Sequence, residues 1–412
     1  MVPVAAAALL AAAPAPGGEV VGDESSLVTS LQAGTTHVGL RYRFEFVDQD
    51  GFEEDALAST ARLRLNFQTG QWRNWRAFGE FDYVGELYFD EFNSGAGTSP
   101  DRTQYPVVAD PEGADLNQLY ADYTVAGGIA RGWQVRLGRQ RINLDDQRFI
   151  GGVGWRQNEQ TFDAVSVTGN AFGEGKLCYG WIGNANRIYG DTVPAGDHRM
   201  NTHLLNLAWR LPGGVSLTPY LYYIDDDDEP AFSTTTAGLR VAGAGETDRG
   251  GYTWLAEYAW QSDAADAPVD FTADYWQLTG RWAPRGKWPA VRVGVASLGG
   301  DDTQAGAAFR TPLATLHAFQ GWADQFLATP DAGVLDVHGG LSVTRGSWQF
   351  EGVYHDFSAQ AGGDSYGREL DLSVARTFGS EYTLALIAAG FDSRSPEFAD
   401  VTKAWIMFTA AW

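Results

Sequence analysis

The 412-residue sequence has almost no cysteine, no long hydrophobic run and no excess of basic charge. Its one cysteine, Cys178, cannot build a disulfide framework within the chain. The net charge is −23, whereas a protein that binds duplex nucleic acid needs a basic face. After the N-terminus the longest apolar run, Leu384 to Ala389, falls far short of the roughly 20 residues of a membrane-spanning helix. These three classes of protein are therefore excluded.

The residues that are abundant point to a folded chain. Hydrophobic residues make up 44% of the sequence and aromatic residues 13%, with 15 Trp, which excludes a disordered protein. The length suggests two or three domains at roughly 150 residues per domain. The 50 Gly and the acidic charge do not name a class by themselves.

The N-terminus resembles an export signal. Val4 to Ala15 form a short Ala/Leu run that ends in a small-x-small cleavage pattern and is too short to anchor a helix in a bilayer. No Lys or Arg precedes Arg41, which a mis-assigned start codon would explain. The alternative is a low-complexity Ala/Pro tail. We expect residues 1–22 to be a signal peptide and flexible N-terminus, with the mature chain beginning between Pro16 and Asp23.

Apolar residues recur with a period of two from Val38 to Trp412. In the first such segment Leu40, Tyr42 and Phe44 alternate with polar residues, and no stretch shows a convincing helical stripe. A period of two gives each strand one apolar and one polar face. The fold is therefore predicted to be all-β.

About 18 such segments follow one another, although 16 is the alternative count. They lie near residues 37–47, 58–68, 74–89, 115–125, 132–140, 160–168, 176–185, 202–211, 215–224, 234–241, 252–262, 273–282, 290–298, 334–343, 347–357, 367–376, 380–391 and 401–412. Connections after odd-numbered segments are mostly long and those after even-numbered segments short, with 242–251 as a mild exception. An even number of roughly ten-residue strands with this alternation predicts a transmembrane antiparallel β-barrel over residues 23–412 in the bacterial outer membrane.

A soluble β-propeller or β-sandwich is the alternative. Neither predicts such regular alternation of loop lengths, and no blade-like repeat of fixed period is present. Aromatic residues near strand ends suit the interfacial girdles of a membrane barrel: Phe44, Phe46, Phe67, Tyr88, Phe89, Trp405 and Trp412.

If the apolar face meets lipid, the intervening polar residues line a lumen. A charge on the lipid face near the midplane costs about 2–4 kcal/mol, so the strand arginines are placed inside: Arg41, Arg43, Arg62, Arg64, Arg76, Arg136, Arg210, Arg240 and Arg292. Acidic residues also point inward, so the lumen holds either stabilising salt-bridge ladders or an arginine-rich constriction that selects anions. Many acidic residues lie in predicted loops, where they are solvated or bind the divalent ions that accompany lipopolysaccharide. Arginines predominate between Arg136 and Arg156, a segment that could fold into the pore.

Two segments resemble the alginate export family of outer-membrane proteins. One runs from Leu137 to Gly151 (LGRQRINLDDQRFIG) and continues to Asp163, and the other from Thr315 to Pro330 contains Gly-Trp-Ala-Asp. The resemblance implies a monomeric barrel of about 18 strands with an electropositive pore, partly plugged by loops, that passes a polyuronate outward. Periplasmic export partners, outer-membrane lipid and lipopolysaccharide are the other partners expected.

The resemblance carries over to residues that match its motifs: Arg139, Arg141, Asp145, Arg148, Arg156 and Asp163 in the first, and Gly321, Trp322 and Asp324 in the second. It implies that some arginines contact the polymer's carboxylates and that Asp145 and Asp163 hold them in place. The alternative for each is a salt bridge that anchors a loop, and for Trp322 packing of a loop against the wall. Arg139 falls on the apolar face of its strand, so either the strand ends at Gly138 or the register slips there.

Two other functions compete. An uptake porin for sugars or small anions would use the same barrel, and stacked inward aromatics would favour neutral sugars; only Tyr120, Tyr220 and Tyr222 are obvious inward aromatics. A barrel hydrolase needs a nucleophile beside a histidine. The six histidines form no motif with a serine, although His338 and His355 are potential neighbours across a hairpin. Metal-ligand spacings and phosphate-binding loops are missing. We therefore expect no enzyme activity and no cofactor.

Overall fold

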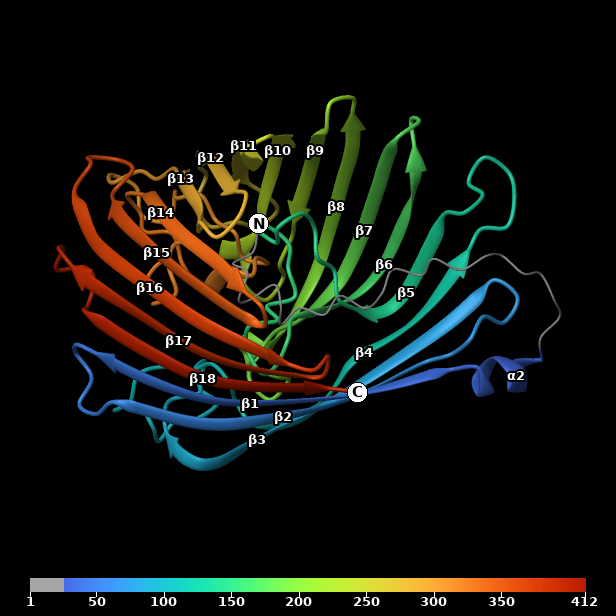
Figure 1. Ribbon diagram of the computed structural model, residues 1–412, viewed down its shortest axis with the longest axis horizontal. Helices are drawn as coiled ribbons and strands as arrows, with labels where there is room; N and C mark the ends of the chain where they lie inside the picture. The colour runs from blue at the N-terminus through green and yellow to red at the C-terminus, as the bar shows by residue number, and fades with distance from the viewer. Residues whose placement is uncertain (1–25) are drawn as a thin grey trace.

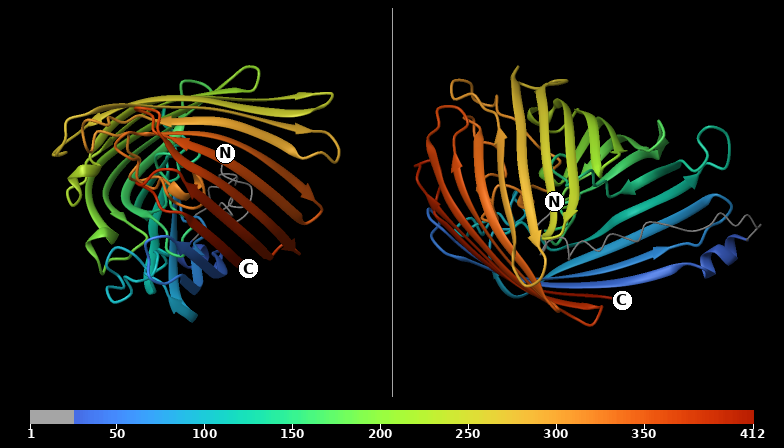
Figure 2. Two further views of the ribbon diagram at one scale, coloured as in Figure 1. Left: turned by 90° about the vertical axis from the view of Figure 1, so that its left-hand side faces the viewer. Right: turned by 45° about the horizontal axis from the view of Figure 1, so that its top comes forward.

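The computed structural model describes residues 26–412, and the predicted signal region lies outside the described residues. Eighteen strands form one antiparallel sheet that closes because β1 pairs with both β2 and β18 (Figures 1 and 2). The strands are β1 (Thr35–Gln49), β2 (Ala56–Gln68), β3 (Trp75–Glu91), β4 (Gly113–Thr124), β5 (Gln134–Gln140), β6 (Thr161–Ala171), β7 (Gly175–Asn186), β8 (Asp197–Leu211), β9 (Val215–Ile224), β10 (Thr234–Thr247), β11 (Gly250–Asp263), β12 (Thr272–Pro284), β13 (Ala290–Leu298), β14 (Val334–Arg345), β15 (Trp348–Ser358), β16 (Ser365–Phe378), β17 (Tyr382–Ser393) and β18 (Val401–Ala411). The predicted 18-stranded barrel is confirmed.

The alternation in sequence becomes an apolar outside and a polar inside. On β1, Leu40 is 36% exposed on the outer face, whereas Arg41 and Arg43 next to it are 4% and 0% exposed. The same holds on β2, where Leu63 and Leu65 face outward. A continuous belt of exposed apolar side chains around a closed sheet suits lipid rather than water.

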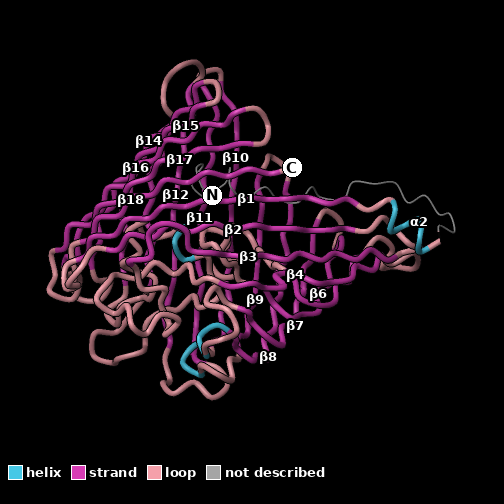
Figure 3. Tube along the Cα trace, turned by 90° about the horizontal axis from the view of Figure 1, so that it is seen from below, coloured by secondary structure: helices cyan, strands magenta, loops and turns pink. Residues whose placement is uncertain are grey.

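The two ends of the barrel differ in their connections. At one end the strands are joined by short turns, and at the other by long loops such as 92–112, 141–160 and 299–333, which gather at one side of the molecule (Figure 3). The region 242–251 is no exception, because β10 continues to Thr247 and β11 begins at Gly250. The turn between them has two residues, so the alternation of long and short connections, to which this region was expected to be a mild exception, holds here too.

A short helix, α2 (Leu27–Gln32), precedes the barrel at the short-turn end. Ser26 caps it by accepting a hydrogen bond from the Thr29 amide, and Ser30 exchanges hydrogen bonds with the backbone of Gly70 in the β2–β3 turn. Three single-turn 3-10 helices, η1 (Pro194–Gly196), η2 (Pro230–Phe232) and η3 (Leu316–Ala318), lie in long loops. Within residues 26–412, no helix has the length and apolarity to cross a membrane.

Several aromatic residues lie inside the barrel. Trp405, predicted to belong to an outer girdle, is 1% exposed and lies opposite Glu45 of β1 on the inner face. Its neighbour Ile406 takes the outward position, so the girdle assignment of Trp405 is wrong. Tyr275 is also buried inside, and Phe78 stacks on Tyr120 at 5.1 Å between ring centroids. The expectation of only three inward aromatics is therefore corrected.

Candidate functional site

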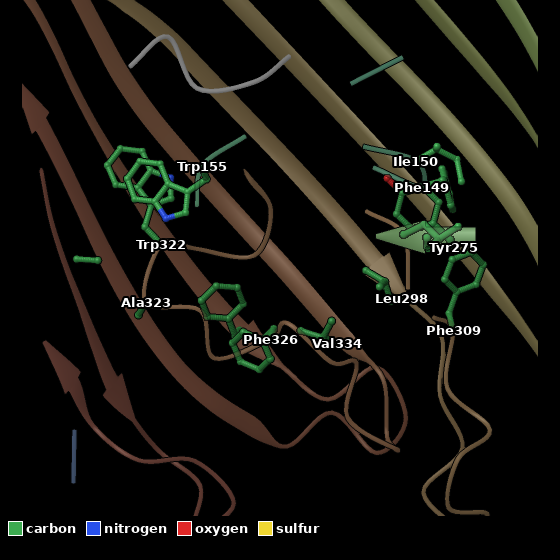
Figure 4. Packing of buried hydrophobic residues seen from close by; sticks show 14 of the residues in the cluster. Phe149, Ile150, Trp155, Tyr275, Leu298, Phe309, Trp322, Ala323, Phe326 and Val334 are labelled. Atoms are coloured by element: carbon green, nitrogen blue, oxygen red, sulfur yellow. The ribbon is translucent and has the colours of Figure 1, made fainter. Parts of the chain in front are cut away.

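Two long loops fold into the lumen. We call residues 141–160 between β5 and β6 inner loop 1, and residues 299–333 between β13 and β14 inner loop 2. They meet through a bridge between Ile150 and Leu313, where the Gly151 amide donates to the Leu313 carbonyl oxygen at 2.8 Å. The buried side chains of both loops cluster inside the barrel wall (Figure 4). These loops, together with the wall, determine the path that remains open.

Aromatic packing fixes the loops to the wall. Phe149 of inner loop 1 lies 5.2 Å from Tyr220 and 5.5 Å from Tyr275, measured between ring centroids. Trp155 stacks on His317 of inner loop 2 at 4.0 Å. Aromatic contacts of this kind stabilise the packing of the loops through the apolar area they bury and through the geometry of the rings. The apolar core of this barrel therefore lies in its lumen.

Arg41 and Arg62 hold the backbone of inner loop 1. Arg41 donates from Nη1 to the Gly154 carbonyl oxygen and from Nε to Oε1 of Gln157, both at 2.9 Å, and Nη2 reaches the Arg156 carbonyl oxygen. Arg62 donates to the Gln157 carbonyl oxygen at 3.0 Å. A loop without regular structure leaves carbonyl oxygens unpaired, and buried ones need donors. These two guanidinium groups supply such donors.

Arg43 pairs with a carboxylate that the sequence analysis missed. Its Nη1 lies 2.9 Å from Oδ2 of Asp110, while Nη2 donates to the Trp155 carbonyl oxygen. The other Asp110 oxygen accepts the Gln157 amide at 2.7 Å. Burial raises the pKa of Asp110, but Arg43 and Arg156 outweigh burial and the pKa ends below its usual value. Asp110 thus joins the β3–β4 loop to inner loop 1.

Glu159 connects two further predicted arginines. Arg64 donates to Oε1 of Glu159 at 2.9 Å and to Asp82 at 2.8 Å, and Arg141 donates from Nε to Oε2 of Glu159 at 2.7 Å. Arg141 also lies 3.3 Å from Glu80. Burial raises the pKa of Glu159, yet the neighbouring arginines hold it well below its usual range. This group is the ladder that the sequence left open as an alternative.

Asp324 brings the two motif segments together. Its carboxylate lies 2.7 Å from Nδ1 of His317, 2.8 Å from Nζ of Lys403 and 3.2 Å from Nη2 of Arg156. Arg156 is also 3.2 Å from Glu45 of β1. Burial raises the pKa of Asp324, but Lys403, His317 and Arg156 hold it far below its usual value. Neither Lys403 nor His317 was predicted to join this group. Lys403 lies 79 residues from Asp324 in sequence, whereas His317 lies only seven residues away.

Gly321 and Trp322 seat inner loop 2 on β16. Gly321 has φ +82°, and a Cβ there would lie 2.4 Å from the Glu369 carboxylate. The Ala323 amide donates to Oε1 of Glu369 at 2.7 Å, and the Trp322 side chain is 6% exposed. The close approach and the left-handed backbone both require glycine. Trp322 packs the loop against the wall and also borders the remaining cavity.

Arg148 has more unpaired buried donors than these anchored arginines, of which Arg62 leaves one, Nε, without a partner among the described residues. Its Nη1 donates to Oε1 of Gln320 at 2.7 Å, but Nε and Nη2 are buried without a hydrogen-bond partner among the described residues. The guanidinium carbon lies 4.7 Å from the Phe319 ring and 5.1 Å from that of Tyr275. A buried cation with unused donors is costly unless something binds it.

The two aspartates beside Arg148 in inner loop 1 accept no hydrogen bond from its Nε or Nη2. Asp145 accepts a hydrogen bond from Asn206 at 2.8 Å, and burial raises its pKa. Asp146 pairs instead with Arg240 at 2.8 Å, and Arg240 also lies 2.9 Å from Glu257. Asp146 is therefore the residue that directly holds Arg240, while Asp145 adds a weaker electrostatic attraction to the same arginine.

A cavity of about 370 Å³ remains between the inner loops and the β9–β15 wall. Its lining contains Arg148, Arg240, Arg281 and Arg292, against the carboxylates of Asp146, Asp336 and Glu351. The guanidinium groups thus outnumber the carboxylates although the whole chain is acidic. Trp322, Gln277 and two histidines also border it.

The sequence of residues 32–311 matches the alginate export family. The chain belongs to that family. No curated protein matches it in sequence. The fold resembles solved outer-membrane porins: OccAB2 of Acinetobacter baumannii (14% identity, TM-score 0.70, covering 92% of this chain and 98% of that one), OpdG of Pseudomonas aeruginosa (13%, 0.70, 93% and 99%) and OpdK of the same organism with vanillate (12%, 0.69, 93% and 99%).

Family and fold together make this protein a porin of the bacterial outer membrane, a channel rather than an enzyme. In the outer membrane, short turns of such barrels face the periplasm and long loops the exterior. The inner loops therefore enter the lumen from the outer side.

Two residues of the first motif lie on the outer face of this alginate export family barrel. Arg139 lies opposite Leu119 and Asp163, and Leu119 is 54% exposed. The strand continues through Gly138 to Gln140 without a register slip. Arg139 donates to Asp163 at 2.9 Å and lies 3.6 Å from Asp115, which neutralises its charge near the outer rim. The prediction that Arg139 and Asp163 line the pore is therefore wrong.

Arg136 does face the lumen. It donates to Asp122 at 2.6 Å and its guanidinium carbon lies 3.7 Å from the Tyr120 ring centroid. This group is near the periplasmic end, away from the inner loops, because β5 begins at Gln134. Because its guanidinium group is paired with Asp122, Arg136 resembles the anchored arginines rather than Arg148.

Proposed function

We propose that this porin is anion-selective and passes carboxylate-bearing sugars, with an alginate-like polyuronate as the polymer. The observation that carries the proposal is Arg148, whose Nε and Nη2 find no partner within residues 26–412 while its side chain lines the cavity. A carboxylate offers two acceptor oxygens in the geometry that a guanidinium group prefers. Because both donors are buried, the Arg148 side chain must turn toward the cavity to bind a passing carboxylate, which would then satisfy them.

The charged side chains around the cavity also support selectivity for anions. Arg240, Arg281 and Arg292 border the same cavity, and charged rings of this sign favour anions in pores. The anchored arginines on the opposite wall add positive charge that is already offset by Asp110, Glu159 and Asp324. Arg240 and Arg292 are themselves offset by Asp146, Glu257 and Glu351. Arg148 and Arg281, rather than the net charge of the chain, would therefore set the selectivity.

The inner loops favour a second candidate, the uptake of small anions or sugars. A cavity of about 370 Å³ lies at the lower end of the range for small-molecule sites, which is roughly 300–1,000 Å³. A continuous polymer would require displacement of the inner loops from their aromatic and ionic contacts. Short oligomers would require less. We also keep as proposals a monomeric state, contact with lipopolysaccharide and periplasmic export partners.

Single-channel recording in planar bilayers tests the proposal. We expect anion selectivity from the reversal potential in a salt gradient and a reversible block by uronate oligomers. Arg148→Gln should weaken the block and reduce the selectivity, whereas Arg199→Gln, in an exposed ion pair with Asp228 at the start of β8, should not change either. Cation selectivity without block would overturn the proposal. Block by small carboxylates but not by oligomers longer than a few units would favour the second candidate.

A further inference from the structure

A cluster of imidazole and carboxylate groups lies on the lumen wall at β14 and β15. Asp336 and His338 occupy successive inward positions of β14, and His355 of β15 lies directly opposite His338. Their exposures are low, and all three side chains border the cavity. None of them contributes to the anchoring of the inner loops described above.

The donor atoms converge. One Asp336 oxygen lies 2.8 Å from Nδ1 of His355 and the other 3.2 Å from Nδ1 of His338. One donor atom from each residue can be chosen so that all lie within 4.8 Å of one another. Ligands bound to zinc at about 2.0–2.1 Å in a tetrahedron are roughly 3.3 Å apart, so a small side-chain movement suffices.

The charge around the cluster favours a cation. On β16, Glu369 and Asp371 face the same wall and are 1% and 0% exposed, and Asp371 lies 3.6 Å from Nε2 of His355. The nearest arginine on β13, Arg292, lies 3.8 Å from Glu351. Three buried carboxylates beside two histidines are costly unless positive charge offsets them.

We propose that Asp336, His338 and His355 form a binding site for a divalent transition metal ion of the Zn²⁺ class. Two imidazoles and one carboxylate suit Zn²⁺, Co²⁺ or Ni²⁺, whereas Mg²⁺ and Ca²⁺ prefer oxygen ligands. Three protein ligands leave a coordination position that faces the cavity and takes water or a carboxylate of a solute. A bound ion adds two positive charges to the lumen wall. The site does not depend on the proposed transport of sugars.

Metal titration of the full-length barrel tests this site. The protein is prepared in detergent without a polyhistidine tag, and Zn²⁺ binding is followed by calorimetry. We expect one Zn²⁺ per chain, with affinity reduced more than about tenfold in His338→Asn and in His355→Asn. The matched control is His198→Asn, which removes another histidine paired with a carboxylate, Asp226 at 2.8 Å, outside the cluster. It should leave the affinity unchanged.

A spectroscopic readout identifies the ligands. Co²⁺ in place of Zn²⁺ should give visible absorption of a low-coordinate nitrogen and oxygen site, and this absorption should disappear in both cluster variants. Heat-modifiable mobility on a gel verifies that each variant is folded. Two results would overturn the proposal. One is stoichiometric binding that survives each substitution; the other is binding by the parent protein that is no stronger than that of a variant lacking both cluster histidines. The latter result would show that the histidines serve only as hydrogen-bond donors to Asp336.

Discussion

Two regions of the lumen differ in how far their arginines are paired. On β1 and β2, Arg41, Arg43 and Arg62 donate to backbone or carboxylate oxygens of loops that fold inward. Facing the β9–β15 wall, Arg148 of inner loop 1 keeps two buried donors that have no partner in the described part of the chain, beside the cavity. An arginine in the lumen thus either anchors a loop or offers a binding group, and Arg240 of β10 belongs with the anchors because it pairs with Asp146 of inner loop 1. Partners, rather than position alone, distinguish the two roles.

Removing an anchor should have the largest effect. Arg43→Gln leaves the Asp110 carboxylate buried without its cation, which costs about 3–5 kcal/mol for a buried pair. We expect inner loop 1 to loosen, the temperature of barrel unfolding on a gel to fall and the single-channel conductance to rise. The double variant Arg43→Gln, Asp110→Asn removes both charges and should recover part of the loss. An unchanged conductance and unfolding temperature would contradict the anchoring role.

Gly321→Ala should displace inner loop 2 from the other wall. The new Cβ would meet the Glu369 carboxylate at 2.4 Å with a backbone of φ +82°, and such strain costs about 1–3 kcal/mol. Limited proteolysis should then cleave residues 299–333 faster than in the parent protein. Gly346→Ala is the control, because Gly346 also has a positive φ but a Cβ there meets no described atom within 4 Å. It separates the strain of the backbone from the clash with Glu369. Equal cleavage rates in both variants would show that the contact with Glu369 is unimportant.

The junction of the two loops should make the protein sensitive to acid. The folded pKa of Asp324 is lowered, so its stabilisation is complete above the unfolded pKa of about 4 and is lost as pH falls through the folded value. Burial also lowers the pKa of His317, so protonating it below about pH 6.5 opposes folding in the same direction. Asp324→Asn should flatten the acidic limb of stability measured between pH 3 and 7. An acidic limb identical to that of the parent protein would contradict this account.

The smallest effect is expected on the outer face. Arg139 and Asp163 form a partly exposed pair, for which about 0–1 kcal/mol is typical. The double variant Arg139→Gln, Asp163→Asn should therefore change stability little and leave ion selectivity unchanged. Altered selectivity in bilayer recordings would show that the outer rim takes part in choosing the solute.

Local periodicity was sufficient to predict the barrel but not its contents. The period of two and the loop lengths predicted all 18 strands, because strand faces depend on neighbours in sequence. The same rule placed Arg139 outside, and Ile406 and Phe408 already implied that Trp405 faces inward. The family-like motifs drew attention to the inner loops, whereas the strand register, correctly applied, excludes Arg139 and Asp163 from the pore.

The partners of the inward arginines could not be predicted, because they come from distant segments. Arg156 and Asp324 are 168 residues apart in sequence, and Arg43 and Asp110 are 67 residues apart. Nothing in the local pattern distinguishes Arg148 from Arg156 in the same loop. Only the folded contacts show which guanidinium group is already occupied.

The reversal potential of single channels, compared between Arg148→Gln and Arg41→Gln, tests the contrast between Arg148 and the anchored arginines most directly. Arg148→Gln should reduce anion selectivity while the unfolding temperature stays the same or rises, since a buried cation with unused donors is removed. Arg41→Gln should instead lower the unfolding temperature and change selectivity mainly by enlarging the pore. Equal loss of anion selectivity in both variants at unchanged conductance would contradict the assignment of Arg148 as the binding group.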